Sequence, residues 1–289
     1  MLCDLTEMGL IKIQGIESKK FLQGQLTCDM ESITPSHGCM GAHCNPQGRI
    51  ISLFYLFMLQ ESYYLLMQQN MIPIAITALK KYAVFFKIEL RDASEDMLAI
   101  GCQNPMPDDA LNNPTCIRIS ISSSRYIIAG TSESIQNIRD EKLKNMSMIS
   151  NDQWKYLDIQ DGIPTLYPIT SGKFLPHDIG LDRLNAISFE KGCYTGQEII
   201  ARMHYRGKLK NHMYKACIST HFSPQAGASI YAQHGDETKV CGMVVDACLA
   251  ANNQYHVLIM TDELHAKHSS LFLHDEKQAI FTVFDQQSG

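Results

Sequence analysis

The chain has 289 residues, of which 45% are hydrophobic and 19% charged, and its formal net charge is −5 at pH 7. These proportions are those of an ordinary globular protein, long enough for two or three domains with substantial cores. They exclude a surface coated with positive charge for nonspecific nucleic-acid binding, and no apolar run approaches the ~20 residues that a membrane helix needs.

Hydrophobic periodicity predicts a mixture of strands and helices up to about residue 160. We expect strands at 10–14, 50–58, 63–67, 87–91, 117–122 and 126–129, with the second and third paired as a hairpin. We expect helices at 18–26, 71–85, 132–144 and 151–160. Residues 103–114, with three prolines and two aspartates, predict a loop, as does most of 164–182.

Beyond Lys210 the pattern becomes all-β. Strands are expected at 213–218, 229–232, 239–250, 254–260, 270–274 and 279–284. Short strands at this spacing are typical of a small barrel. Periodicity alone therefore predicts an α+β body followed by a C-terminal β module.

The ten cysteines are irregularly spaced, which favours free thiols in a reducing compartment over a disulfide framework. The N-terminus lacks a basic secretory n-region and the Arg-rich character of a mitochondrial presequence, so we expect a cytoplasmic protein. Cys39 and Cys44, with His37 and His43 nearby, superficially resemble a metal cluster. Structural zinc sites usually draw paired ligands from two separated segments, and no second pair is apparent, so no metal is expected.

Residues 188–198, the signature segment, contain one cysteine in a position that can tune its chemistry. Thr195, followed three residues later by Glu198, predicts a capping box that opens a helix. Cys193 would then lie near the positive end of that helix and two residues after Lys191, which should lower the pKa of its thiol. A strand-to-helix turn with a buried structural cysteine fits the same spacing equally well.

A basic stretch follows the signature segment. Arg206, His204, Lys208 and Lys210 alternate with other residues, so an extended chain would place them on one face. We interpret Arg202 and Arg206 as contacts for an anion, such as a phosphate or a glutamate tail. The lysines are more simply a solvated edge.

Residues 191–198, KGCYTGQE, resemble the signature of the YgfZ-type folate-binding, tRNA-modifying family. These proteins are relatives of the glycine-cleavage aminomethyltransferase and include a mitochondrial iron–sulfur assembly factor. Residues 15–29, 42–49 and 80–85 resemble further blocks of the family. Besides the cysteine and Lys191, the motif positions that we expect to be structural are Gly192, Tyr194, Thr195, Gly196, Gln197 and Glu198.

The resemblance implies an α+β, aminomethyltransferase-like, three-lobed folate-binding fold with a small C-terminal β-barrel. We expect a folate-binding region of two interleaved lobes at residues 1–208 and the barrel at 209–289. The implied function is a folate-binding accessory protein that supports iron–sulfur enzymes and thereby tRNA modification. Its expected cofactor is tetrahydrofolate or a derivative, and its expected partners are folate and an iron–sulfur enzyme.

The resemblance also implies which residues bind folate. Trp154, the single tryptophan, matches an aromatic position that contacts folate in the family, although a lone tryptophan on an amphipathic helix is often a core residue. A second family tryptophan falls on Met8. Methionine can pack against a ring but cannot stack on it as another ring does.

Two alternative functions follow from the same residues. An aminomethyltransferase would need a carboxylate after residues 48–51, where this chain has Ser52 and Leu53, neither of which can act as a general base. Asp29 and Glu198 are candidate substitutes, but a protein without this enzymatic activity is the better prediction. The other alternative is direct tRNA binding through the basic stretch at 202–210.

The chemistry of Cys193 stays open at this level. Its thiol can act as a nucleophile that carries a one-carbon unit or a persulfide. It can form a transient ligand or a mixed disulfide with an iron–sulfur partner, or serve as a redox-sensitive thiol. All three chemistries predict that Cys193 is selectively reactive.

Overall fold

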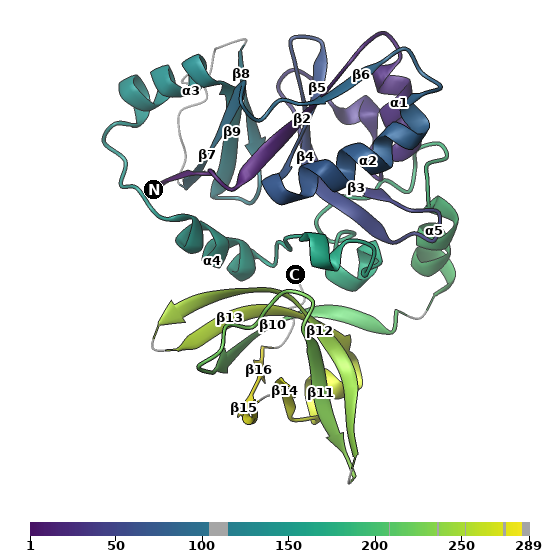
Figure 1. Ribbon diagram of the computed structural model, residues 1–289, viewed down its shortest axis with the longest axis vertical. Coiled ribbons are helices and arrows are strands. Elements are labelled where there is room, and N and C mark those ends of the chain that lie inside the picture. Colours follow the sequence, from purple (N-terminus) through teal and green to yellow (C-terminus); the bar gives the residue numbers. More distant parts are fainter. Residues whose placement is uncertain (104–114, 208, 236, 252, 274–275, 285–289) are drawn as a thin grey trace.

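The structure is a computed structural model that describes residues 1–103, 115–207, 209–235, 237–251, 253–273 and 276–284. Within these residues the strands form three sheets, and each sheet is the centre of one lobe (Figure 1). Two sheets lie side by side in the upper part of the molecule, and the third curves below them. In the described residues no helix is both long and apolar enough to cross a membrane.

The first lobe is built on a five-stranded sheet of order β3-β4-β5-β2-β6. Its strands are β2 (Met8–Gln14), β3 (Cys39–Cys44), β4 (Ile50–Leu59), β5 (Ser62–Gln68) and β6 (Glu89–Asp92). The antiparallel register of β4 and β5, with Leu59 opposite Ser62, confirms the predicted hairpin. Its helical elements are α1 (Ser18–Gln25), η1 (Met30–Ser32), η2 (Gln69–Met71) and α2 (Ile72–Ala83).

The second lobe is built on a four-stranded sheet of order β1-β7-β9-β8. Its strands are β1 (Leu2–Asp4), β7 (Met97–Gln103), β8 (Cys116–Ser120) and β9 (Arg125–Thr131). The predicted helix at 132–144 consists of α3 (Ser132–Ile138) and a π-helical turn, η4 (Arg139–Leu143). Of the predicted loop at 103–114, residues 104–114 lie outside the described part of the chain.

A long connection joins these two lobes to the third. It begins with α4 (Asn151–Asp161), which has a capping box of Ser150 and Gln153 and ends at Gly162 in the left-handed conformation. Two 3-10 helices, η5 (Pro168–Thr170) and η6 (Pro176–Ile179), interrupt the predicted loop at 164–182. The connection ends with α5 (Gln197–Arg206).

The third lobe is the predicted C-terminal β module, a seven-stranded antiparallel sheet of order β15-β14-β11-β12-β13-β10-β16. The strands are β10 (Asn211–Ser219), β11 (Ser229–His234), β12 (Glu237–Ala251), β13 (Gln254–Asp262), β14 (Leu271–Leu273), β15 (Glu276–Ile280) and β16 (Thr282–Val283). A short helix, α6 (Glu263–His268), follows β13. Helix α4 packs against β12 and β13, and it thereby connects this lobe to the other two (Figure 1).

Candidate functional site

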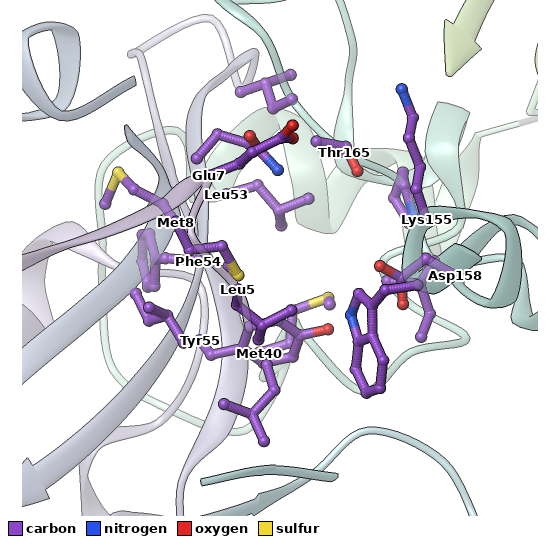
Figure 2. A pocket seen from close by; sticks show the side chains of 18 of the residues that line it. Leu5, Glu7, Met8, Met40, Leu53, Phe54, Tyr55, Lys155, Asp158 and Thr165 are labelled. Atoms are coloured by element: carbon purple, nitrogen blue, oxygen red, sulfur yellow. The ribbon is translucent and has the colours of Figure 1, made fainter. Parts of the chain in front are cut away.

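A pocket opens where the first two lobes meet α4 and the segment after it. Its empty volume is about 760 Å³ when the solvent at its open mouth is included. Figure 2 shows Met8, Phe54 and Tyr55 on one wall, with Lys155 and Asp158 on the facing wall. The pocket therefore combines an apolar wall from the first sheet with a polar wall from α4.

Trp154 and Met8, the two residues expected to contact folate, both line this pocket. The Trp154 indole is 5% exposed and belongs to the core cluster between the first two lobes. Its six-membered ring lies over Gly101, where an added Cβ would be only 2.6 Å from the indole. The Arg125 guanidinium lies 4.8 Å from the ring centroid. Trp154 is thus both a core residue and part of the pocket wall.

The polar wall carries an ion pair that reaches into the third lobe. The Lys155 ammonium lies 2.7 Å from Asp246, a 1% exposed carboxylate on β12. The Tyr167 hydroxyl donates a hydrogen bond of 2.9 Å to the same carboxylate. Burial alone would lower the pKa of Lys155, but the adjacent Asp246 raises it above its usual value. Lys155 therefore stays cationic, and the third lobe holds it at the pocket.

Asp158 supplies a carboxyl group one helical turn from Trp154. Burial raises the pKa of Asp158 to about 6, although its ion pair with Arg125, at 2.8 Å, acts in the opposite direction. Near neutral pH this carboxyl can accept hydrogen bonds, and in mild acid it can donate one. Asp158 and Lys155 were not expected from the sequence. Residues four apart on a helix share a face, so the position of Trp154 could have indicated Asp158.

The signature segment lies elsewhere, since none of residues 188–198 lines the pocket. Cys193 is exposed on this segment, so the alternative of a buried structural cysteine is wrong. The predicted capping box is also wrong: Gly196, at φ 85°, is the N-cap of α5, and no side chain caps the helix. Thr195 instead donates its hydroxyl to the Gln25 side chain, at 3.2 Å.

Lys191 points into the interior, in contrast to the neighbouring Cys193. Its ammonium donates to the carbonyl oxygens of Leu26, at 2.9 Å, and Cys28, at 2.8 Å. Burial lowers the pKa of Lys191 to about 8, while Cys28, Asp29 and Cys39 act to raise it. Its charge thus acts on the Cys28 and Cys39 thiols of the first lobe, and its expected effect on Cys193 stays a prediction.

The basic stretch does not form the expected single face. His204 and Arg206 belong to the last turn of α5, where residues two apart point in nearly opposite directions. Arg202 and Arg206 are exposed, and neither lines the pocket. Lys208 lies outside the described residues. The nearest candidate for an anion contact at the pocket is therefore Lys155.

The positions considered for an aminomethyltransferase carboxylate separate in space. Leu53 lines the pocket, whereas Ser52 is fully buried and pairs with His43 across β3 and β4. Asp29 accepts hydrogen bonds from the Gln23 side chain and the Glu31 backbone, and Glu198 is exposed on α5. Among the described residues, no group of three or more histidine, cysteine or acidic side chains could hold a metal ion.

Comparison with known proteins identifies relatives over nearly the whole chain. The tRNA-modifying protein YgfZ of Photobacterium profundum is 30% identical over 98% of this chain and 90% of its own. The tRNA-modifying protein YgfZ of Colwellia psychrerythraea is 34% identical over 84% of this chain and 80% of its own. A search of protein-family models finds no match.

A solved structure confirms the predicted fold class. The glycine cleavage system aminomethyltransferase T of Bartonella henselae matches with a TM-score of 0.72 at 15% identity. The match covers 99% of this chain and 85% of that chain. The fold is therefore the aminomethyltransferase fold, with an antiparallel, barrel-like C-terminal sheet. The predicted domain boundary at residues 208 and 209 stays a prediction.

Proposed function

This chain belongs to the YgfZ family, and from that premise we propose that it is a folate-binding accessory protein of tRNA modification. It would act in the cytoplasm by supporting iron–sulfur enzymes, one of which modifies tRNA. Tetrahydrofolate or a derivative would occupy the pocket, and Cys193 would provide a reactive thiol. The observation that carries this proposal is that Trp154 and Met8, far apart in sequence, line one pocket of the aminomethyltransferase fold.

The chemistry of the pocket fits tetrahydrofolate. A flat pterin needs an apolar slot, and Leu53, Phe54 and Met40 provide apolar surface there (Figure 2). The polar edge of a pterin carries amide and amino groups, which can donate hydrogen bonds to the Asp158 carboxylate. The anionic glutamate tail of a folate matches the cationic Lys155, although Asp246 already neutralises part of that charge.

Leu53 favours an accessory role over aminomethyl transfer. A leucine on the pocket wall can neither position nor deprotonate an amine-bearing intermediate. Ser52, beside it in sequence, is buried away from the pocket. The pocket is therefore better suited to holding a folate than to transferring its one-carbon unit.

Cys193 is suited to chemistry with a large partner. Its thiol is exposed on the segment that precedes α5, whereas Cys28 and Cys39 of the first lobe lie in a hollow. An exposed thiol can reach a partner's cluster or disulfide without any rearrangement of the fold. Folate binding and thiol reactivity would then be separable functions of one protein.

A rescue experiment tests this separation. Cells that lack their own YgfZ protein would be supplied with this chain, and the activity of their iron–sulfur enzymes would be measured. We expect Cys193→Ala to abolish rescue without changing protein abundance. Cys217→Ala, which removes a half-buried thiol on β10, is the matched control and should rescue as the unchanged chain does. Full rescue by Cys193→Ala would overturn the thiol role.

A further inference from the structure

Two cysteines that the proposed function does not use, Cys28 and Cys39, lie on neighbouring segments of the first lobe. Leu26 forms an antiparallel bridge with His43, and the Thr27 backbone N–H donates to the Ala42 carbonyl, at 2.9 Å. Continuing this register places Cys28 beside Gly41 of β3. Cys39 lies two residues before Gly41 on β3, so its side chain is on the same face of the strand as position 41.

Gly41 leaves the space that lets the two thiols meet. A Cβ at position 41 would lie only 2.5 Å from the Cys28 Sγ, a distance that real Cβ atoms do not show. Because this space is free, the Cys28 thiol lies over β3 on the face that Cys39 shares, and both cysteines line one hollow. Any larger residue at position 41 would displace the Cys28 thiol.

The pair is accessible from a hollow of its own. Cys28 and Cys39 line a second pocket of about 1000 Å³, including its open mouth. Cys28 is buried, whereas Cys39 is partly exposed. The hollow also presents polar side chains that suit a small peptide-like molecule, namely Asp29, Ser32, His37, Ser120, Asn185 and Ser188. A small solute can therefore reach Cys39 first.

Lys191 provides a positive charge behind this pair. Its ammonium is fixed by hydrogen bonds to the carbonyls of Leu26 and Cys28. The neighbouring Cys28 thiol lowers the pKa of the Cys39 thiol, as does the Lys191 charge, against the opposing effect of burial. The Cys39 thiol and burial in turn raise the pKa of Cys28. Cys39 is thus the thiol of the pair that ionises more readily, and Cys28 is the one that keeps its proton.

We propose that Cys28 and Cys39 form a second reactive thiol site, which reduces a low-molecular-weight disulfide and closes an intramolecular disulfide. The Cys39 thiolate attacks one sulfur of the small disulfide, which forms a mixed disulfide and releases one small thiolate. Cys28 then loses its proton and attacks the Cys39 sulfur, and the second small thiol leaves with that proton. Overall the protein loses two electrons and the Cys28 proton, and the small disulfide becomes one thiolate and one thiol.

This site is independent of both folate and Cys193. Met40, Tyr55 and Ile163 line both pockets, so these side chains form a wall between the thiol pair and the proposed folate pocket. Neither the attacking thiol nor the resolving thiol belongs to the signature segment. The proposal would therefore survive the failure of the folate assignment.

Peptide mapping after exposure to glutathione disulfide tests the proposal. The whole chain carrying Cys193→Ala is incubated with glutathione disulfide, alkylated, and cleaved after glutamate, which separates Cys28 from Cys39 at Glu31. We expect the two peptides to be joined by a disulfide. Recovery of both cysteines as alkylated thiols, under conditions that glutathionylate the half-buried Cys217, would overturn the proposal.

Variants that lack one cysteine of the pair show which thiol attacks first. Cys28→Ser should accumulate a stable glutathione adduct on Cys39, and Cys39→Ser should leave Cys28 unmodified. Cys28→Ala provides the same test if serine at this buried position disturbs folding. An adduct on Cys28 in Cys39→Ser, formed as fast as the disulfide forms with both thiols present, would contradict the assigned order. Lys191→Met should slow the first step at neutral pH, because Cys39 loses a charge that favours its thiolate.

Discussion

The pocket around Trp154 and the signature segment around Cys193 differ in how far their functional groups are buried. The pocket lies between lobes, is mostly apolar, and holds Lys155 and Asp158 in ion pairs with Asp246 and Arg125. In the signature segment the Cys193 thiol is exposed to solvent, while Lys191 points into the first lobe. The sequence motif by which the chain resembles the family therefore lies outside the pocket lined by Trp154 and Met8.

Strand β3 contacts both regions. Met40, near its start, lines the pocket, and Cys44, at its end, would lie 3.3 Å from a Cβ at Gly196. The close approach of Gly196 to the backbone of Asn45 explains why this N-cap is a glycine. The two regions are thus joined through one strand but present different chemistry. Variants on either side should separate binding from reactivity.

The largest expected effect comes from the pocket wall. Trp154→Ala should destabilise the protein by about 3–5 kcal/mol, because it opens a cavity against Gly101 and Arg125. It should also weaken tetrahydrofolate binding by about 1–3 kcal/mol, by analogy with bases that stack on aromatic side chains. Denaturant unfolding and calorimetry measure the two effects.

Tyr156→Ala is the matched control on the same helix. Tyr156 packs edge-on against His256 and does not line the pocket. We expect a loss of stability with unchanged folate affinity. If Tyr156→Ala and Trp154→Ala weaken folate equally, the effect of Trp154 is general destabilisation and not contact.

The protein should lose stability in acid because of His43, a buried residue on β3. His43 is 2% exposed, and burial lowers its pKa to about 4 from an ordinary 6.5. Between these values the unfolded chain binds the proton and the folded chain does not. The stability is therefore fully present above about pH 6.5 and falls as the pH drops toward 4, by about 3 kcal/mol in total.

Urea unfolding at a series of pH values measures this contribution. His43→Leu should flatten the dependence between pH 6.5 and 4, whereas His37→Leu, at an exposed position, should leave it unchanged. The same slope in His43→Leu as in the unchanged chain would show that another group titrates.

A smaller effect is expected from placing an aromatic residue at position 8, on the pocket wall. Met8→Trp should strengthen tetrahydrofolate binding by about 0.5–1.5 kcal/mol, since a ring can stack where a thioether cannot. Leu98→Trp, at an exposed position on β7 away from the pocket, should leave affinity unchanged. Calorimetry is the measurement, because both variants add a second tryptophan. Weaker binding by Met8→Trp would place the ligand away from β2.

The smallest effect is expected at the basic end of α5. Arg206 is exposed, and of the arginines and lysines on α5 only Arg202, one turn earlier, shares its face, so the helix presents two charges and not a basic stripe. We therefore expect Arg206→Ala to leave any binding of tRNA, and its salt dependence, unchanged. If α5 recognises tRNA directly, the log–log slope of affinity against salt should instead weaken by about 0.9 for each phosphate that the variant no longer neutralises.

The elements with strong periodicity could be predicted from the sequence. Strand β4 is a run of large apolar and aromatic residues interrupted only by Ser52, and α4 carries both cap residues that its ends require. Strand β3 was missed because its sequence, CMGAHC, has no alternation of apolar and polar residues. Its role as a strand depends on pairing with β4 along its whole length.

The site was predictable only in part, because tertiary contacts decide which way its side chains point. Trp154 and Met8 could be found by resemblance, and both line the pocket. Local sequence gives no sign that Lys191 reaches two carbonyls in the turn after α1, or that Lys155 pairs with a carboxylate of β12. The predicted capping box is wrong for the same reason, since the Thr195 hydroxyl donates to Gln25, the last residue of α1, and not to the backbone of α5.

The most direct test of the central claim is a titration with tetrahydrofolate, followed by the fluorescence of the single tryptophan and by calorimetry. The unchanged chain and Cys193→Ala would be compared. We predict saturable quenching with the same affinity in both, because Trp154 lines the pocket and Cys193 does not. The absence of both quenching and heat would contradict folate binding and leave a reactive-thiol adaptor in its place.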